Sequence, residues 1–160
     1  MTLRTPLLLA AAILAGCSNV PLGETATTSR PMIEQVETTR DGTSTAATVD
    51  SYKADLAQRI YAVNSTQVYT TRPQALLRSV VVVKYTVDSA GNLVRSEIAR
   101  SNHDRTTEAT ALATLRKSAP FPKPSPHLLR NGRLEMHESW LFNNDGRFQL
   151  RSLALVQMDE

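Results

Sequence analysis

The fold is decided by residues 78–92, which read RSVVVVKYTVDSAGN. Every second residue from Val81 to Val87 is a large apolar one, and the run is rich in β-branched side chains. This alternation predicts a strand with one buried face. Turn residues follow, among them Gly91, which is free to adopt a positive φ. Residues 93–100 then return as a partner strand, so the stretch predicts a β-hairpin.

Two helices are predicted beside this hairpin. Apolar residues at helical spacing predict the first over about 51–63, with Asp50 or Ser51 as its N-cap. The second is predicted over 104–118, where a narrow alanine and leucine stripe follows capping residues. The hairpin therefore has a helix on each side of it in the chain.

The C-terminal part of the chain predicts a crossover and two more strands. Alternating prolines in residues 120–126 predict an extended segment, either a stiff crossover or a ligand for an aromatic groove. Period-two apolar residues from Arg133 include Trp140, which the phase places in the core. A tight turn leads to a last strand over Arg147 to Leu155. The order α-β-β-α-β-β predicts an α+β domain over 50–158, with a small antiparallel sheet and two helices.

The N-terminus carries a targeting signal. One basic residue precedes an apolar run of about nine residues, whereas about 20 are needed to span a bilayer. The run ends in Leu14-Ala15-Gly16-Cys17, which resembles the lipobox of bacterial lipoproteins. The resemblance implies a signal peptide over 1–16, cleavage between Gly16 and Cys17, and acyl chains on Cys17. The alternative is an ordinary signal peptide that ends near an unmodified cysteine.

The anchor and the linker predict where the domain sits. Ser18 follows the cysteine in place of an aspartate, which by the same resemblance implies the periplasmic face of the outer membrane. Residues 17–49 are rich in threonine and serine and contain no aromatic residue, so they predict a flexible tether after the lipidated cysteine. The partner implied at this end is the membrane itself, through the lipid on Cys17.

Composition excludes several classes of function. The chain has 160 residues and a formal charge of +3, too small a basic excess to predict nucleic-acid binding. Its single cysteine forms no internal disulfide and excludes zinc sites that need two thiolates. Neither a cofactor, a metal nor a small-molecule substrate is expected.

The stretch from Tyr69 to Phe148 resembles the C-terminal domain shared by TonB and TolA, the periplasmic energy transducers. The shared pattern comprises a proline, a strand with alternating valines, an Asp-x-x-Gly hairpin, a turn with serine, an alanine-rich helix, a Phe-Pro segment and a strand with an aromatic residue. In this chain these are Pro73, Val81-Val83-Tyr85-Val87, Asp88-Ser89-Ala90-Gly91, Ser101-Asn102, Glu108-Ala109-Thr110-Ala111-Leu112, Phe121-Pro122 and Trp140-Leu141-Phe142.

The resemblance implies a protein-binding module. Members of the family pair an extended partner segment with a sheet edge, so an envelope protein is the expected partner, with a link to TonB-type transport. The chain departs from the transducers in its cleaved signal and short tether, where they have a transmembrane helix and a long spacer. Direct energy transduction by this chain alone is therefore not expected.

The candidate binding edges are the outer strands, the last one and the one over 93–100. The side chains expected to meet an acidic partner there are Arg95, Arg100, Arg147, Gln149 and Arg151. The alternative is that these arginines form a solvated face or protect the edges from aggregation.

Two other classes of function compete with this hypothesis. An envelope hydrolase is disfavoured because catalytic motifs are absent from the sequence, and because His137 and Glu138 are neighbours on a strand and so face opposite ways. A structural lipoprotein is the second alternative. It would stabilise an outer-membrane assembly through Trp140, the proline-rich segment or the sheet face.

Overall fold

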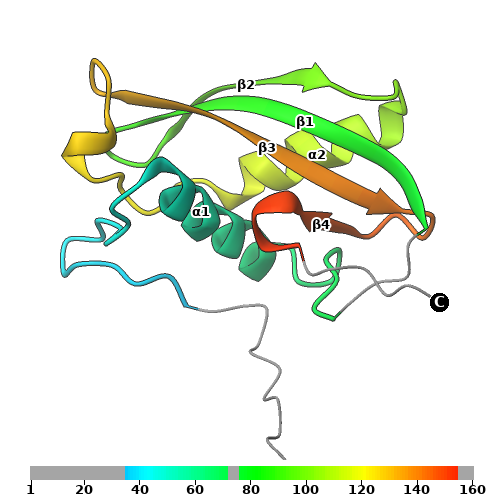
Figure 1. The fold of residues 1–160 in the computed structure, drawn as a ribbon, viewed down its shortest axis with the longest axis horizontal. Coiled ribbons are helices and arrows are strands. Elements are labelled where there is room, and N and C mark those ends of the chain that lie inside the picture. The colour runs from blue at the N-terminus through cyan, green and yellow to red at the C-terminus, as the bar shows by residue number, and fades with distance from the viewer. Residues whose placement is uncertain (1–34, 72–75, 155–160) are drawn as a thin grey trace, which may run out of the picture. The chain divides into compact units, whose positions relative to one another are not determined.

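The computed structural model describes residues 35–71 and 76–154. The predicted α+β order is confirmed, with two short 3-10 helices in addition (Figure 1). The signal peptide, the lipobox and Cys17 lie outside the described residues. The elements are α1 (Val49–Val63), β1 (Leu77–Asp88), β2 (Leu93–Arg100), α2 (Arg105–Ser118), η1 (Pro126–Leu128), β3 (Arg133–Asn143), β4 (Phe148–Leu150) and η2 (Arg151–Leu153).

The sheet is antiparallel throughout, in the order β2-β1-β3-β4. Both predicted candidate strands are therefore confirmed as the outer strands. Helix α2 contacts β1 and β2 and packs against α1, and it lies behind the sheet in the view of Figure 1. The helices share one face of the sheet, and no described helix covers the other.

The core lies between the sheet and the helices. The predicted buried face of β1 is confirmed, since Val81, Val83, Tyr85 and Val87 are at most 1% exposed. Trp140 on β3 is fully buried in the same cluster, as its phase predicted. Burial of such side chains stabilises the fold by roughly 1.5–3 kcal/mol each.

Gly91 ties the hairpin to the Phe-Pro segment. Its φ is +83°, and a Cβ at this position would lie 2.2 Å from the carbonyl oxygen of Phe121. The Phe121 N–H in turn donates to the Gly91 carbonyl oxygen at 2.9 Å. Phe121 is 4% exposed, so this part of the proline-rich segment is a packed crossover rather than a free ligand.

The helix starts are set by side-chain caps. Asp104 caps α2, with its carboxylate accepting from the N–H groups of Thr106 and Thr107. The predicted N-cap of α1, Asp50 or Ser51, is wrong. Thr48 is the N-cap, and it forms a capping box with Ser51. Reciprocal bonds between cap and third residue satisfy two free N–H groups, which outweighs a cap at either predicted position.

The segment before α1 differs from the predicted tether. Residues 35–48 lie against the domain, and Ser44 is only 2% exposed. The Ser44 N–H donates to the Lys123 carbonyl oxygen at 2.9 Å, and its hydroxyl donates to the Asp55 carboxylate. Composition predicted flexibility because this segment has little apolar surface. Hydrogen bonds to the domain order it instead.

The last strand is shorter than predicted. It covers Phe148–Leu150, after which the chain turns into η2, so the prediction of a strand as far as Leu155 is wrong. Leu153 packs against the core from η2, and Ser152 hydrogen-bonds to the carboxylate of Glu138. The turn into η2 places Ser152 beside the buried carboxylate of Glu138. An alternating apolar pattern in the sequence does not reveal such a turn.

Candidate functional site

The two outer strands differ in whether their free backbone groups are occupied. The outer edge of β4 is closed by the chain itself. The Phe148 N–H donates to the Gln67 carbonyl oxygen at 2.9 Å, and its own carbonyl accepts from the Tyr69 N–H at 3.1 Å. The next outward-facing N–H, that of Leu150, donates to the hydroxyl of Tyr61 at 3.0 Å. A partner strand would have to displace all three bonds.

Side chains hold this closing segment in place. The guanidinium of Arg147 lies 4.1 Å from the ring centroid of Tyr69, and its Nε donates to the Asp145 carboxylate at 2.8 Å. The Tyr69 hydroxyl donates to the same carboxylate at 2.6 Å. Burial, the largest single effect, raises the pKa of Asp145, but the bonds from Tyr69 and Arg147 together outweigh it, so the pKa of this carboxyl is lowered. Arg147 is thus engaged within the domain.

The other two candidate residues at this end are also poorly placed for a partner. Gln149 is 2% exposed, and its Nε2 has no hydrogen-bond partner among the described residues. Arg151 is exposed but lies in η2, beyond the strand. The structure therefore disfavours β4 as the binding edge.

The direction of the free groups on β2 follows from the ladder. Backbone groups alternate sides along an antiparallel strand. The Asn143 N–H bonds to Arg147 before β4, so the alternate residue Phe142 directs its groups toward β1. The same alternation can be followed from β3 to β1 and from β1 to β2 through the paired residues. It directs the N–H and C=O groups of Ser96 and Ile98 away from β1.

No described segment hydrogen-bonds to this outward side of β2. Along 8 residues the strand offers unpaired N–H and C=O groups, the feature that strand addition uses. The exposed large hydrophobic side chain on β2 is that of Val94, which is 45% exposed.

The two candidate arginines on β2 are exposed. Arg95 pairs with Glu97 at 2.6 Å, and Arg100, at the end of the strand, forms no ion pair within the described part of the chain. The edge therefore carries cationic groups near both ends and a single carboxylate between them.

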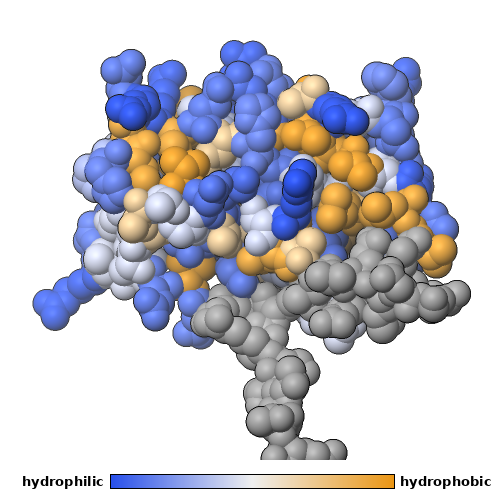
Figure 2. Space-filling model, viewed as in Figure 1, coloured by the Kyte–Doolittle hydropathy of each residue, from blue (hydrophilic) through white to orange (hydrophobic). Residues whose placement is uncertain are grey.

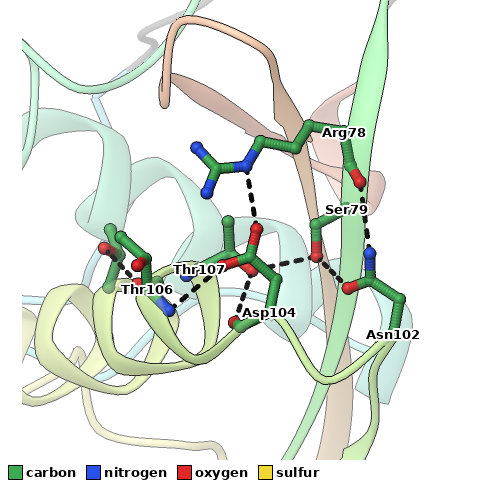
Figure 3. Close-up of polar contacts among 7 residues, drawn as sticks. Arg78, Ser79, Asn102, Asp104, Thr106 and Thr107 are labelled. Carbon is green, nitrogen blue, oxygen red and sulfur yellow. Dashed lines mark hydrogen bonds and ion pairs between the residues drawn. The ribbon is translucent and has the colours of Figure 1, made fainter.

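A network of hydrogen bonds fixes the end of β2 (Figure 3). The Ser79 hydroxyl on β1 donates to Asn102 at 2.6 Å and accepts from the Thr107 hydroxyl of α2 at 2.9 Å. Arg78 donates to the Asp104 carboxylate at 2.8 Å, as the dashed line between them shows. Strand, turn and helix are thereby joined, so a partner would meet a preorganised edge.

The residues considered for catalysis do not converge. His137 is exposed while Glu138 is 3% exposed, so the expectation that they face opposite sides is confirmed. Burial raises the pKa of Glu138, against bonds from Ser152 and Ser139. His127 donates through Nε2 to the Ala47 carbonyl oxygen at 2.9 Å. Within residues 35–71 and 76–154, no cluster of three or more acidic, histidine or cysteine side chains could hold a metal.

The closing segment Gln67–Tyr69 was missed by sequence reasoning. It makes only an isolated bridge, Val68 to Phe148, so it has no strand-length pattern. The one available signal was the pair of β-prone residues Val68 and Tyr69 between the end of a helix and a proline. Two residues are too few to show an alternation.

Comparison with known proteins identifies the family. A family model described as the TonB C terminal matches residues 49–135, more than half of the 160 residues. The match begins with α1 and ends inside β3, so β4 lies beyond it. Neither the curated proteins nor the solved structures gave a match. In the described part of the chain, no helix is both long and apolar enough to cross a bilayer. The chain belongs to the TonB C-terminal family, whose domains are non-enzymatic modules that bind other proteins of the cell envelope.

Proposed function

We propose that this protein binds an extended segment of another envelope protein, which adds as a fifth strand beside β2. The observation that carries the proposal is the contrast between the sheet edges: β4 is closed by the chain's own residues, whereas none of the residues that the structure describes pairs with the outer side of β2. Backbone bonds to β2 supply affinity, and Arg95 and Arg100 favour an acidic segment. The protein acts as a binding module without catalysis.

We also propose that Cys17 carries the lipid anchor at the periplasmic face of the outer membrane. The motif Leu14-Ala15-Gly16-Cys17 supports this, as does Ser18 after it. The test is metabolic labelling with a radioactive fatty acid, followed by membrane fractionation. The proposal requires label in the wild type and none in Cys17→Ser. Equal labelling of the two chains would contradict it.

Strand addition is tested by photo-crosslinking in intact cells. A benzophenone amino acid at Val94, on the exposed side of β2, is expected to trap an envelope protein. Ser96→Pro should abolish the crosslink, because it removes an outward N–H without removing a bond to β1. The melting temperature of the Ser96→Pro chain serves as the folding control.

The matched control places the same photo-crosslinker at Arg116, which is exposed on α2. Strand addition predicts no crosslink there. A crosslink at Val94 that persists in folded Ser96→Pro would show that β2 is not paired through its backbone.

A structural role in an outer-membrane assembly is the second candidate. Hydrophobic side chains are exposed near the start of β1, and Figure 2 shows hydrophobic surface gathered at the right of the view. Gene deletion separates the two roles. A leaky envelope would favour the structural role, and loss of TonB-type import would favour a transport-linked module. The exposed hydrophobic residues near the start of β1 are Leu76, Leu77 and Val80, which are 52%, 47% and 40% exposed.

A further inference from the structure

A basic cleft opens where β2 begins. Its volume is about 560 Å³, and its walls include side chains from β1, β2, β3 and the turn before β3. Open-face residues such as Thr86 and Glu135 lie opposite each other in the β1–β3 register, so the cleft lies on the face without helices. The charged lining residues are Arg95, Arg130, Arg133 and Glu135.

Two of the three guanidinium groups in the cleft have no counter-ion among residues 35–71 and 76–154. Glu135 is paired with Lys84 at 3.1 Å, and Arg95 is paired with Glu97 at 2.6 Å. Arg130 and Arg133 form no ion pair with any residue that the structure describes.

The positive charge of Arg133 acts on the carboxylate of Asp88, beyond the distance of an ion pair. The pKa of Asp88 is lowered first by hydrogen bonds from Asn92 and only last by the charge of Arg133. Neither cleft arginine is therefore held in an ion pair within the described part of the chain, and both can bind an anion.

The backbone holds these two arginines together. The Arg130 N–H donates to the Arg133 carbonyl oxygen at 2.8 Å, and the Arg133 N–H donates back at 3.1 Å. Asn131 and Gly132 form the turn between them, with φ of 53° and 72°. Directly opposed residues of a hairpin project to the same side, and like charges so placed repel each other. The two like charges therefore repel each other. Asp88, opposite Arg133 in the β1–β3 register, reduces this repulsion, and an anion between the two guanidinium groups would reduce it further.

We propose that this cleft binds a carboxylate of an acidic protein segment. Guanidinium groups recognise carboxylates through paired hydrogen bonds. Val94, which is 45% exposed, adds an apolar side chain, which suits a peptide with an apolar residue beside the acid. Glu135 reduces the positive charge, which disfavours the dense charge of a phosphorylated lipid headgroup. The inference rests on the proposed function for the class of ligand, a protein segment, and does not require strand pairing.

The test uses a hexaglutamate peptide as the probe. The ¹⁵N-labelled full chain is titrated with it, and amide shifts are followed at 0.1 M and 0.5 M salt. We expect saturable shifts at Val94, Arg95, Arg130 and Arg133 that weaken in high salt. The double variant Arg130→Gln/Arg133→Gln should weaken binding by about tenfold or more, the loss of at least one charge-assisted pair.

The matched control is Arg105→Gln/Arg116→Gln, which removes the same charge from exposed positions on α2. It should change binding by less than about twofold. The cleft variant should also melt no lower than the wild type, because it removes a repulsive pair. Equal weakening in both double variants would overturn the proposal, and so would shifts with phosphatidylglycerol vesicles but not with the peptide.

Ser96→Pro separates the cleft from strand addition. It should leave hexaglutamate binding unchanged while abolishing the crosslink from Val94. In the chain without Ser96→Pro, absence of the crosslink with intact peptide binding would count against strand addition alone. Absence of peptide binding with an intact crosslink would overturn the cleft alone.

Discussion

The two outer strands of one sheet meet the same physical problem, unpaired backbone groups at an edge, in opposite ways. On β4 all three residues are buried, and residues Gln67–Tyr69 together with the Tyr61 hydroxyl complete the hydrogen bonds. On β2 the edge is left open, and exposed charges such as Arg95 and Arg100 occupy it. Charge on an edge strand prevents aggregation with other strands while it leaves the backbone accessible.

Whether a sheet edge can bind a partner is decided by the chain that surrounds it. β4 would be the more hydrophobic docking strand, yet its outward groups are already paired. β2 has no such neighbour among the described residues. The family match ends at Glu135, so the strand that forms the closed edge belongs to the part of this chain beyond the match.

Truncating the closed edge should have the largest effect. Phe148 is fully buried, with its ring centroid 5.4 Å from that of Phe142. Phe148→Ala should lower the free energy of unfolding by about 3–5 kcal/mol. Val94→Ala on the open edge should cost less than about 0.5 kcal/mol, because the side chain is 45% exposed. Urea unfolding measures both free-energy losses. Similar losses in the two variants would contradict the difference proposed between the two edges.

Removing one hydroxyl should weaken the closed edge by a smaller amount. Tyr61→Phe leaves the buried Leu150 N–H without an acceptor, which should cost about 1–3 kcal/mol and speed amide exchange at Leu150. Tyr52→Phe is the control, since it loses a bond to the Pro122 carbonyl oxygen elsewhere in the core. Unchanged exchange at Leu150 in Tyr61→Phe would refute the role given to this hydroxyl.

The buried carboxylate that holds η2 should give a pH-dependent effect. Burial raises the pKa of Glu138, so the folded state binds this proton more tightly than the unfolded state does. Its contribution to stability is therefore greatest below the ordinary glutamate pKa of about 4.3, and it falls as the pH rises through the raised value.

Glu138→Gln should remove this fall and stabilise the protein at pH 8 by roughly 1 kcal/mol. The measurement is the difference in urea midpoint between variant and wild type from pH 4 to pH 8. Burial also raises the pKa of Asp55, but both chains share that effect, so it cancels. A difference that does not change with pH would show that Glu138 titrates alike in both states.

The smallest effect is expected at the surface of the closed edge. Arg147→Ala removes the stack on Tyr69 and a half-exposed ion pair, for a loss of about 0.5–1 kcal/mol. Exchange at the Tyr69 amide should rise with it. Arg95→Ala on the open edge should leave both quantities unchanged, and equal effects of the two variants would mean that Arg147 does not hold the closing segment.

Local pattern was sufficient to predict the strand–turn–strand core of this fold. The alternation from Val81 to Val87 and the phase of Trp140 predicted their burial, and both outer strands were anticipated. The closing residues Gln67–Tyr69 and the ordered segment around Ser44 were not. Both are held by backbone and hydroxyl bonds to residues far away in the chain, such as Phe148 and Lys123, which periodicity does not encode. The cleft was missed because Arg130 and Arg95 are separated in sequence and meet only across the sheet.

The contrast between the edges is tested most directly by amide hydrogen exchange of the free protein. We expect the amides of Phe148 and Leu150 on β4 to be strongly protected, whereas those of Ser96 and Ile98 on β2 should exchange near the rates of solvent-exposed amides. Strong protection of Ser96 and Ile98, or rapid exchange at Phe148 and Leu150, would contradict this expectation.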